Sequence, residues 1–188
     1  MSVSVQLAHH LFTVSDYHCM RESGVLNEDS RVELLNGEII KMSPIGPRHS
    51  AKVKKLRTLL GKQLEESVVI GVQDPIQLDD YSEPQPDLSV LKPRADYYEA
   101  AHPLPPDVLF VIEVAASSAV IDREVKLPAY ARAGVAEVWL VDLTKDRIEV
   151  HSNPHNGVYQ EVRIVQRGQE VISTTLPQLK LKADDILA

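Results

Sequence analysis

Two carboxylate residues lie within strongly apolar segments of this sequence. Asp87 opens the run Asp87-Leu88-Ser89-Val90, and Glu113 lies inside the more apolar segment 108–115. Removing an unpaired charge from water is costly, so a buried carboxylate usually pairs, takes up a proton or binds a metal. Carboxylate oxygens are the ligands that Mg²⁺ and Mn²⁺ prefer in proteins. Two such groups on neighbouring strands would form a site for a divalent cation.

A lysine close to Glu113 would complete a catalytic acid–lysine set. Strand side chains alternate between faces, so Glu113 and Ala115 point to the same face. Ala115 occupies the lysine position of a Glu-x-Lys motif, and the next helix offers Lys126 as a substitute, whose long side chain can reach back over the strand end. The alternative is that Lys126 merely pairs with Asp122 at i, i+4, which contributes about 0.2–0.5 kcal/mol.

The elements that position these residues follow from hydrophobic spacing and turn residues. Asn36-Gly37 between two apolar runs predicts a β-hairpin over residues 31–42. Apolar residues three and four apart predict an amphipathic helix from residue 48 to about residue 67. Gly134 is expected to cap a helix over residues 122–132. A short helix is expected at residues 14–22, and strands are expected near residues 68–72, 76–78, 87–91, 108–115, 136–142, 147–152 and 158–166.

The remaining segments are predicted to connect or cover these elements. Residues 92–107 are rich in proline and predict an excursion over the surface, and residues 153–157 predict a turn. The tail at residues 176–188 is expected to pack back on the core. The order predicts a mixed α/β fold whose sheet starts antiparallel and gains a strand–helix–strand crossover at residues 108–142.

Composition limits the class of protein. The 188 residues are 44% apolar and 25% charged, which is typical of a globular protein, and we expect one domain over residues 1–188 with a flexible segment at 1–12. No apolar run approaches the length of about 20 residues that a membrane span needs. The first residues do not resemble a signal peptide, and the single cysteine, Cys19, excludes an intrachain disulfide. The cytoplasm is the expected compartment.

The net charge of −7 argues against a protein that coats nucleic acid without specificity. A local basic face is still available on the helix expected from residue 48, where Arg48, Lys52, Lys55 and Lys62 share a rough stripe. The alternative is an ordinary solvated helix face.

An ordered set of short motifs resembles a known family. The set consists of Glu33-Leu34-Leu35-Asn36-Gly37-Glu38, Met42-Ser43-Pro44, His49, Pro86-Asp87, Ile112-Glu113-Val114, Asp122-Arg123-x-x-Lys126-Leu127 and Tyr130-Ala131-Arg132-Ala133-Gly134-Val135-x-Glu137-Val138-Trp139-x-Val141-Asp142. It is similar to the Uma-two family of endonucleases, a branch of the PD-(D/E)XK restriction-endonuclease-like superfamily, over roughly residues 13–188. Single dipeptides such as Pro-Asp are weak signals, whereas the ordered set is specific.

The resemblance implies a restriction-endonuclease-like core, in which helices flank a central mixed β-sheet, with an N-terminal hairpin and extra C-terminal strands. It also implies a Mg²⁺-dependent phosphodiesterase site, with Mn²⁺ as a substitute metal. Asp87 and Glu113 match the metal-binding acids, and Lys126 matches a lysine that has migrated onto the helix. The carbonyl of Val114 would complete the metal ligands. The sequence departs from the family pattern at Pro128, which removes a helical hydrogen bond and should kink the turn that carries Lys126.

Glu33 and His49 match two further positions of the family. Glu33 would hold a second metal or order the attacking water, and the alternative is a salt bridge within the hairpin. His49 would accept a proton or contact phosphate at a helix N-terminus, and capping or packing is the alternative. Tyr130, Glu137 and Trp139 are expected to have structural roles. The histidines at positions 9, 10, 102, 151 and 155 have no spacing that suggests a metal cluster.

Three functions remain open on sequence alone. The first is a Mg²⁺-dependent endonuclease that acts on DNA, in which case a homodimer is expected because cutting both strands needs two sites. The second is a catalytically decayed module that binds nucleic acid or protein. The third keeps the metal site and assigns it a nucleotide or a small phosphate ester.

Overall fold

The computed structural model describes residues 9–64, 67–116 and 119–188. Of the segment expected to be flexible, residues 1–8 therefore lie outside the described residues, as do Glu65 and Glu66 at the expected end of the second helix. Phe12, at the end of this segment, is bound to the turn of the N-terminal hairpin, because its backbone N–H donates to the carbonyl of Gly37 at 2.9 Å.

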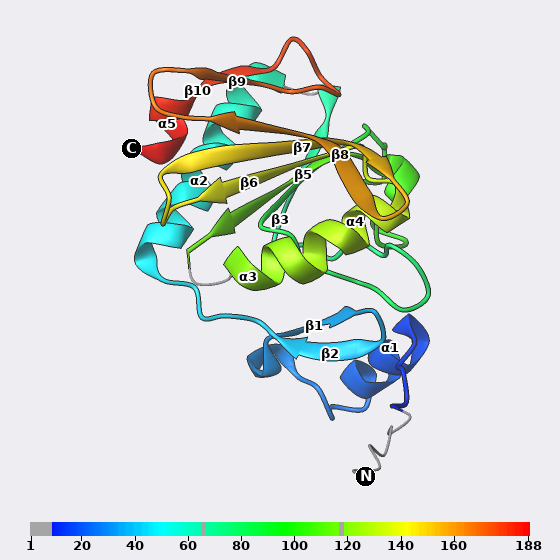
Figure 1. Cartoon of the computed structure of the whole chain (residues 1–188). Coiled ribbons are helices and arrows are strands. Elements are labelled where there is room, and N and C mark those ends of the chain that lie inside the picture. The colour runs from blue at the N-terminus through cyan, green and yellow to red at the C-terminus, as the bar shows by residue number, and fades with distance from the viewer. Residues whose placement is uncertain (1–8, 65–66, 117–118) are drawn as a thin grey trace.

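A six-stranded mixed sheet forms the centre of the molecule (Figure 1). The strand order is β3-β4-β5-β6-β7-β8, and β5 and β6 run parallel while the other neighbours run antiparallel. The crossover predicted for residues 108–142 is therefore confirmed. The strands are β3 (Val69–Val72), β4 (Leu88–Leu91), β5 (Val108–Ala115), β6 (Glu137–Asp142), β7 (Arg147–His155) and β8 (Val158–Val165).

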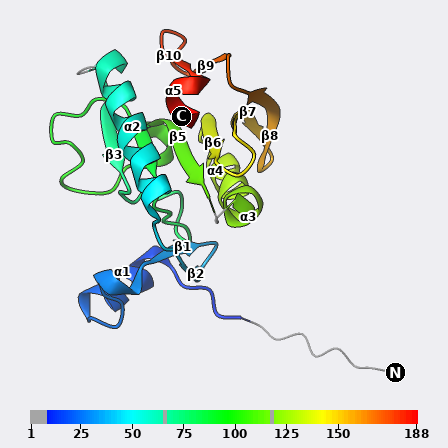
Figure 2. The same ribbon diagram turned by 90° about the vertical axis from the view of Figure 1, so that its left-hand side faces the viewer.

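Helices cover both faces of this sheet, as Figure 2 shows. On one face, α2 (Pro47–Leu64) and α5 (Ala183–Leu187) pack against a core that includes Phe110, Ile112 and Trp139. On the other face, α4 (Leu127–Ala133) packs against a second core. Burial on both faces explains why β4, β5 and β6 are almost continuously apolar in sequence.

The N-terminal part lies beside the main sheet as a separate small layer (Figure 1). It contains α1 (Val14–Glu22), the short 3₁₀ helix η1 (Glu28–Ser30) and the hairpin of β1 (Val32–Leu35) and β2 (Glu38–Lys41). Asn36 and Gly37 both have positive φ, at 53° and 79°, as a type I′ turn requires. The predicted hairpin is therefore confirmed.

The crossover helix after β5 is interrupted at the turn that carries Lys126. It consists of α3 (Ala119–Ile121), a π-helical turn named η4 (Asp122–Lys126), and α4. The N–H of Leu127 donates to the carbonyl of Asp122, which is the wider spacing of a π turn. Pro128 is the second residue of α4, where the missing N–H is tolerated. The predicted irregularity is present and takes the form of a π turn, and Gly134 caps α4 with φ 80° as expected.

Three local predictions were wrong or incomplete. Residues 76–78 form no strand, although Leu78 N–H bonds Ser82 in a tight loop. Residues 153–155 belong to β7, so the β7–β8 turn is centred on Asn156 and Gly157. No strand was predicted at β9 (Glu170–Ile172), which pairs with β10 (Lys180–Lys182) ahead of α5. The C-terminal tail does pack on the core, since Ile186 is fully buried.

Among residues 9–64, 67–116 and 119–188, no helix has the length and apolar character needed to cross a bilayer.

Candidate active site

A cavity of about 270 Å³ lies between the hairpin, the start of α2 and the carboxyl end of β5. The five side chains predicted to act in catalysis all line it, together with Asp122 and with Arg48 near the beginning of α2. Those five side chains are Glu33, His49, Asp87, Glu113 and Lys126. Five segments of the chain thus converge on one space.

Asp87 and Glu113 are neighbours because β4 and β5 pair antiparallel. Leu88 is opposite Ile112 in the register, which places Asp87 opposite Glu113 at the sheet end. Asp87 Oδ2 accepts the N–H of Val114 at 2.9 Å, and the N–H of Asp87 lies 3.4 Å from Glu113 Oε2. The two carboxylates are 9% and 3% exposed, so both lie largely out of water. The structure therefore places the two acids on neighbouring strands, as the sequence predicts.

Val114 contributes to this pair through its backbone. Its side chain belongs to the core on the α2 face, while Glu113 points to the α4 face. Its N–H orients Asp87, as described above. Its carbonyl as a metal ligand stays a prediction.

Lys126 reaches the acids from the π turn. Its Nζ lies 3.3 Å from Glu113 Oε1 and 3.0 Å from Glu33 Oε2, and the residue is 6% exposed. Burial alone would lower the pKa of Lys126, but the carboxylates of Glu113 and Glu33 raise it above its ordinary value. Lys126 is thus a buried cation held between two carboxylates of different elements.

Glu33 connects the hairpin to this centre. It is 2% exposed, and its Oε2 accepts the backbone N–H of Gln85 at 3.0 Å in addition to its contact with Lys126. Both partners lie outside the hairpin, so a salt bridge inside the hairpin does not describe this residue. Glu33 therefore fixes Lys126 relative to the loop before Asp87.

His49 orients Asp87 from the first turn of α2. Its Nε2 is 2.9 Å from Asp87 Oδ2, and this hydrogen bond raises the pKa of His49 although burial opposes the shift. Its Nδ1 is buried and has no hydrogen-bond partner among the described residues. Buried polar atoms are normally satisfied, so this nitrogen has room for a water or another external group.

Three further residues contribute that sequence reasoning did not place in the centre. Tyr130, expected only to pack, is fully buried and its hydroxyl donates to Glu113 Oε1 at 2.7 Å. Gln73 Nε2 donates to Asp87 Oδ1 at 3.2 Å. Asp122, considered only as a partner of Lys126, lines the cavity and is 3% exposed. Only the position of Tyr130 on the crossover helix, one turn after Lys126, was a usable signal.

Glu137 and Trp139 lie away from the cavity and have the structural roles expected of them. Trp139 stacks on Phe110 with ring centroids 5.1 Å apart and donates its indole N–H to Glu137. The other oxygen of Glu137 accepts from the backbone N–H groups of Thr174 and Thr175. This network ties β6 to the segment after β9.

The buried acids of the cavity are donors that could hold a divalent cation. Four carboxylates, those of Glu33, Asp87, Glu113 and Asp122, are each at most 9% exposed. Lys126 is buried among these acids, while Arg31, Lys41 and Arg48 also line the cavity. Burial raises the pKa of Glu113 to about 8, against the effect of the Lys126 charge. Buried carboxylate oxygens of this kind are ligands that fit Mg²⁺ or Mn²⁺.

Comparison with solved structures supports the fold. The chain is similar to a protein described as "a putative nuclease belonging to DUF820" from Anabaena variabilis ATCC 29413, with a TM-score of 0.73. The match covers 94% of this chain and 97% of that chain at 17% sequence identity. No curated protein matches the chain significantly.

Comparison with protein families gives a match over almost the full length. The family model of Uma2, described as "Putative restriction endonuclease", matches residues 14–184. That range contains the three sheets of the described residues, the crossover helix and every residue that lines the cavity. This chain therefore belongs to the Uma2 family.

Proposed function

We propose that this protein is a Mg²⁺-dependent endonuclease that hydrolyses phosphodiester bonds of DNA. The observation that carries the proposal is the convergence of Asp87, Glu113 and Lys126 in one cavity. The carboxylate of Glu113 lies 3.3 Å from Lys126 Nζ and 3.4 Å from the backbone nitrogen of Asp87. Membership of the Uma2 family and the likeness to a protein described as a nuclease support the same class of reaction.

Asp87, Glu113 and the carbonyl of Val114 would hold the metal. When bound, Mg²⁺ polarises a phosphate oxygen and lowers the pKa of a coordinated water. The Lys126 ammonium, fixed between Glu113 and Glu33, is placed to orient a water and to offset the charge that develops on phosphorus-bound oxygens.

Glu33 and His49 act in this proposal as positioning residues. Glu33 holds the ammonium of Lys126 at 3.0 Å, and His49 holds one oxygen of Asp87 at 2.9 Å. Partners of this kind orient metal ligands and commonly affect metal affinity by about 10–100-fold. The same proposal can be extended by two further roles, in which His49 accepts a proton and Glu33 binds a second metal.

The basic residues of α2 are proposed to contact the DNA backbone. Arg48 is exposed and lines the cavity, whereas Lys52 is buried, so the predicted stripe is only partly available to a ligand. We also propose a homodimer, since two copies related by a two-fold axis would present two sites to the two strands. Analytical ultracentrifugation with and without duplex DNA tests the dimer.

The contacts of Lys126 favour the enzyme over the decayed binding module. That alternative rested on Pro128, on Ala115 in place of a lysine and on the acidic net charge. The π turn before Pro128 leaves Lys126 in contact with Glu113. Pro128 is therefore no longer an argument that Lys126 points away from the acids.

Cleavage of a mixed DNA panel tests the proposed activity. Plasmid, linear duplex, single-stranded and branched DNA are incubated with Mg²⁺ or Mn²⁺ and the wild-type protein. Asp87→Ala, Lys126→Ala and the exposed control Lys145→Ala are purified identically. We expect metal-dependent products that persist with Lys145→Ala and vanish with the other two variants. Products that are equal in all four preparations would contradict the proposal.

A further inference from the structure

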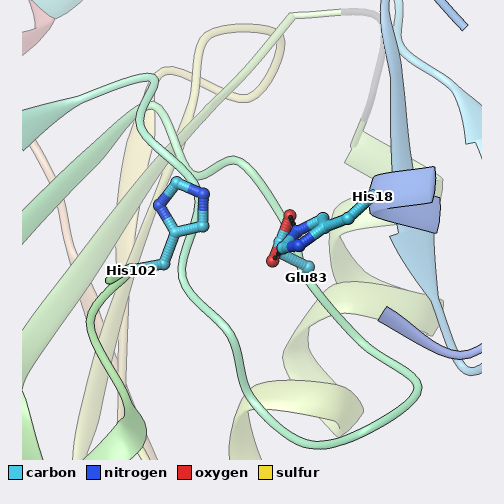
Figure 3. Close-up of side chains that lie close together, drawn as sticks. All are labelled: His18, Glu83 and His102. Carbon is cyan, nitrogen blue, oxygen red and sulfur yellow. Dashed lines mark hydrogen bonds and ion pairs between the residues drawn. The ribbon is translucent and has the colours of Figure 1, made fainter. Parts of the chain in front are cut away.

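A second cluster of metal-ligating side chains lies outside the cavity (Figure 3). His18 comes from α1, Glu83 from the loop between β3 and β4, and His102 from the segment that precedes β5. One ligand atom of each residue lies within 4.8 Å of the others. Sequence spacing could not reveal this trio, because its members come from three distant segments.

Glu83 provides a carboxylate that the fold holds in place. The residue is 3% exposed, and its N–H donates to the carbonyl of Leu34 at 2.8 Å. His18 Nε2 lies 3.0 and 2.9 Å from the two carboxylate oxygens. A buried carboxylate of this kind requires a partner, and the imidazole of His18 is the partner that the structure gives it.

The two histidines border this carboxylate on the solvent side. The side chain of His18 is 40% exposed, and His102 is an exposed residue. Their ring centroids are 6.1 Å apart, with an interplanar angle of 71°. A metal with bonds of about 2.0–2.1 Å needs tetrahedral ligand atoms about 3.3 Å apart. His18 Nε2 and the Glu83 oxygens are already slightly closer than this, so the exposed imidazole of His102 is the ligand that has to rotate toward them.

We propose that His18, Glu83 and His102 form a binding site for a transition-metal dication of the Zn²⁺ class. Two imidazoles and one carboxylate are a ligand set typical of Zn²⁺ with an open fourth position. Mg²⁺ prefers oxygen ligands, so this site differs in chemistry from the cavity at Asp87. The proposal does not depend on nuclease activity.

A metal in this site would tie α1 to the main body. Glu83 is joined to β1 through Leu34, and Gln85 two residues later holds Glu33. His102 precedes Pro103, whose carbonyl accepts the N–H of Gln77. Gln77 lies in the loop between β3 and β4 that also carries Glu83. A bound ion would thus stabilise the contact between the N-terminal layer and the loop that leads to Asp87, and raise the unfolding temperature.

The test is a Zn²⁺ titration of the full chain after dialysis against a chelator. The Glu113→Gln background is used so that the oxygen-rich cavity competes less for the ion. His18→Ala and His102→Ala are compared with His155→Ala, an exposed histidine at the β7–β8 turn. Affinity is followed by competition with a chromophoric chelator, and the thermal midpoint with and without Zn²⁺ is recorded for each protein.

We expect one Zn²⁺ per chain in the background protein and in His155→Ala. We expect affinity at least about 10-fold weaker in His18→Ala and His102→Ala, with the thermal shift reduced in parallel. Equal affinity in His102→Ala and His155→Ala would overturn the proposal, as would the absence of saturable binding in the background protein. His102 is exposed, so its truncation should not impair folding, and circular dichroism checks this.

Discussion

The ammonium of Lys126 lies 3.0 Å from the carboxylate of Glu33, and this contact joins the N-terminal hairpin to the crossover helix. Lys126 also contacts Glu113 on β5 at 3.3 Å. The hairpin therefore supplies part of the polar centre, in addition to standing beside the sheet. Buried ion pairs add little net stability but are costly to break, because the remaining charge is left uncompensated.

Replacing Lys126 by methionine should abolish catalysis while keeping the volume of the side chain. Glu33 and Glu113 lose their shared cation, and we expect the free energy of unfolding to fall by about 3–5 kcal/mol because buried acids are left without a counter-charge. Cleavage rates and urea unfolding measure the two effects, with Lys145→Met as the exposed control. Cleavage at the wild-type rate by folded Lys126→Met would contradict the assigned role.

Pro128→Ala tests whether the π turn aims Lys126. Alanine restores a backbone N–H and relieves the ring clash that a regular α-helix would impose at this position. We expect the turn at Asp122–Lys126 to shift toward α-helical spacing, with kcat lowered about 10-fold by the misplacement of the Lys126 ammonium. Pro154→Ala, on β7 and away from the cavity, is the control. An unchanged kcat in Pro128→Ala would show that the turn does not depend on the proline.

Arg48→Ala tests the proposed DNA-facing side of α2. Each phosphate contact contributes to the slope of log K against log salt, so we expect the slope to decrease in magnitude by about 1. Binding is measured with Ca²⁺ in place of Mg²⁺ over a range of salt concentrations. Lys92→Ala, exposed and outside the cavity lining, should leave the slope unchanged. Equal salt slopes for Arg48→Ala and Lys92→Ala would contradict the prediction, and would indicate that this face of α2 contacts solvent and not DNA.

Acid sensitivity should arise from the ion pairs of Arg123. Burial alone would raise the pKa of Asp142, but hydrogen bonds from Thr144 and Arg123 hold it well below its ordinary range. Burial likewise opposes, without reversing, the lowering of the pKa of Glu149 by Arg123 and Arg147. At Asp142 and Glu149 the folded protein therefore binds fewer protons than the unfolded chain. The resulting stability is present above the unfolded-state pKa near 4 and is lost as the pH falls through the folded-state values.

Urea unfolding as a function of pH measures this effect. We expect the free energy of unfolding to fall steadily below about pH 4 in the wild-type protein. Asp142→Asn should lose about 1–3 kcal/mol at neutral pH and show a flatter acid branch. Asp185→Asn, at an exposed position of α5, should match the wild type. An acid branch of equal slope in Asp142→Asn would contradict the assignment.

Local chemistry explains which parts of the fold could be predicted. Asn36-Gly37 specified its turn because both residues accept positive φ, and Gly134 specified the end of α4 for the same reason. Ile76 and Leu78 are buried and apolar, which is typical of a strand, yet residues 76–78 fold into a loop that is closed by its own hydrogen bonds. Burial in an irregular loop leaves no periodicity to distinguish it from a strand.

The candidate site was predictable where one element carries the signal. Asp87 and Glu113 were visible because carboxylates are rare within apolar runs. Tyr130 was taken only for a core residue, although it lies one turn after Lys126 on the crossover helix and its hydroxyl meets Glu113. The trio of His18, Glu83 and His102 depends wholly on tertiary contacts and had no sequence signal.

Binding of Mg²⁺ to the wild-type protein, Asp87→Asn and Glu113→Gln tests the central claim most directly. Calorimetry reports binding without requiring the right DNA substrate, and Mg²⁺ has little preference for the histidine trio. Glu99→Gln, at an exposed position, is the matched control. We expect saturable binding in the wild type and Glu99→Gln that is lost in both other variants. Folded Asp87→Asn and Glu113→Gln proteins that bind Mg²⁺ as the wild type does would contradict the account.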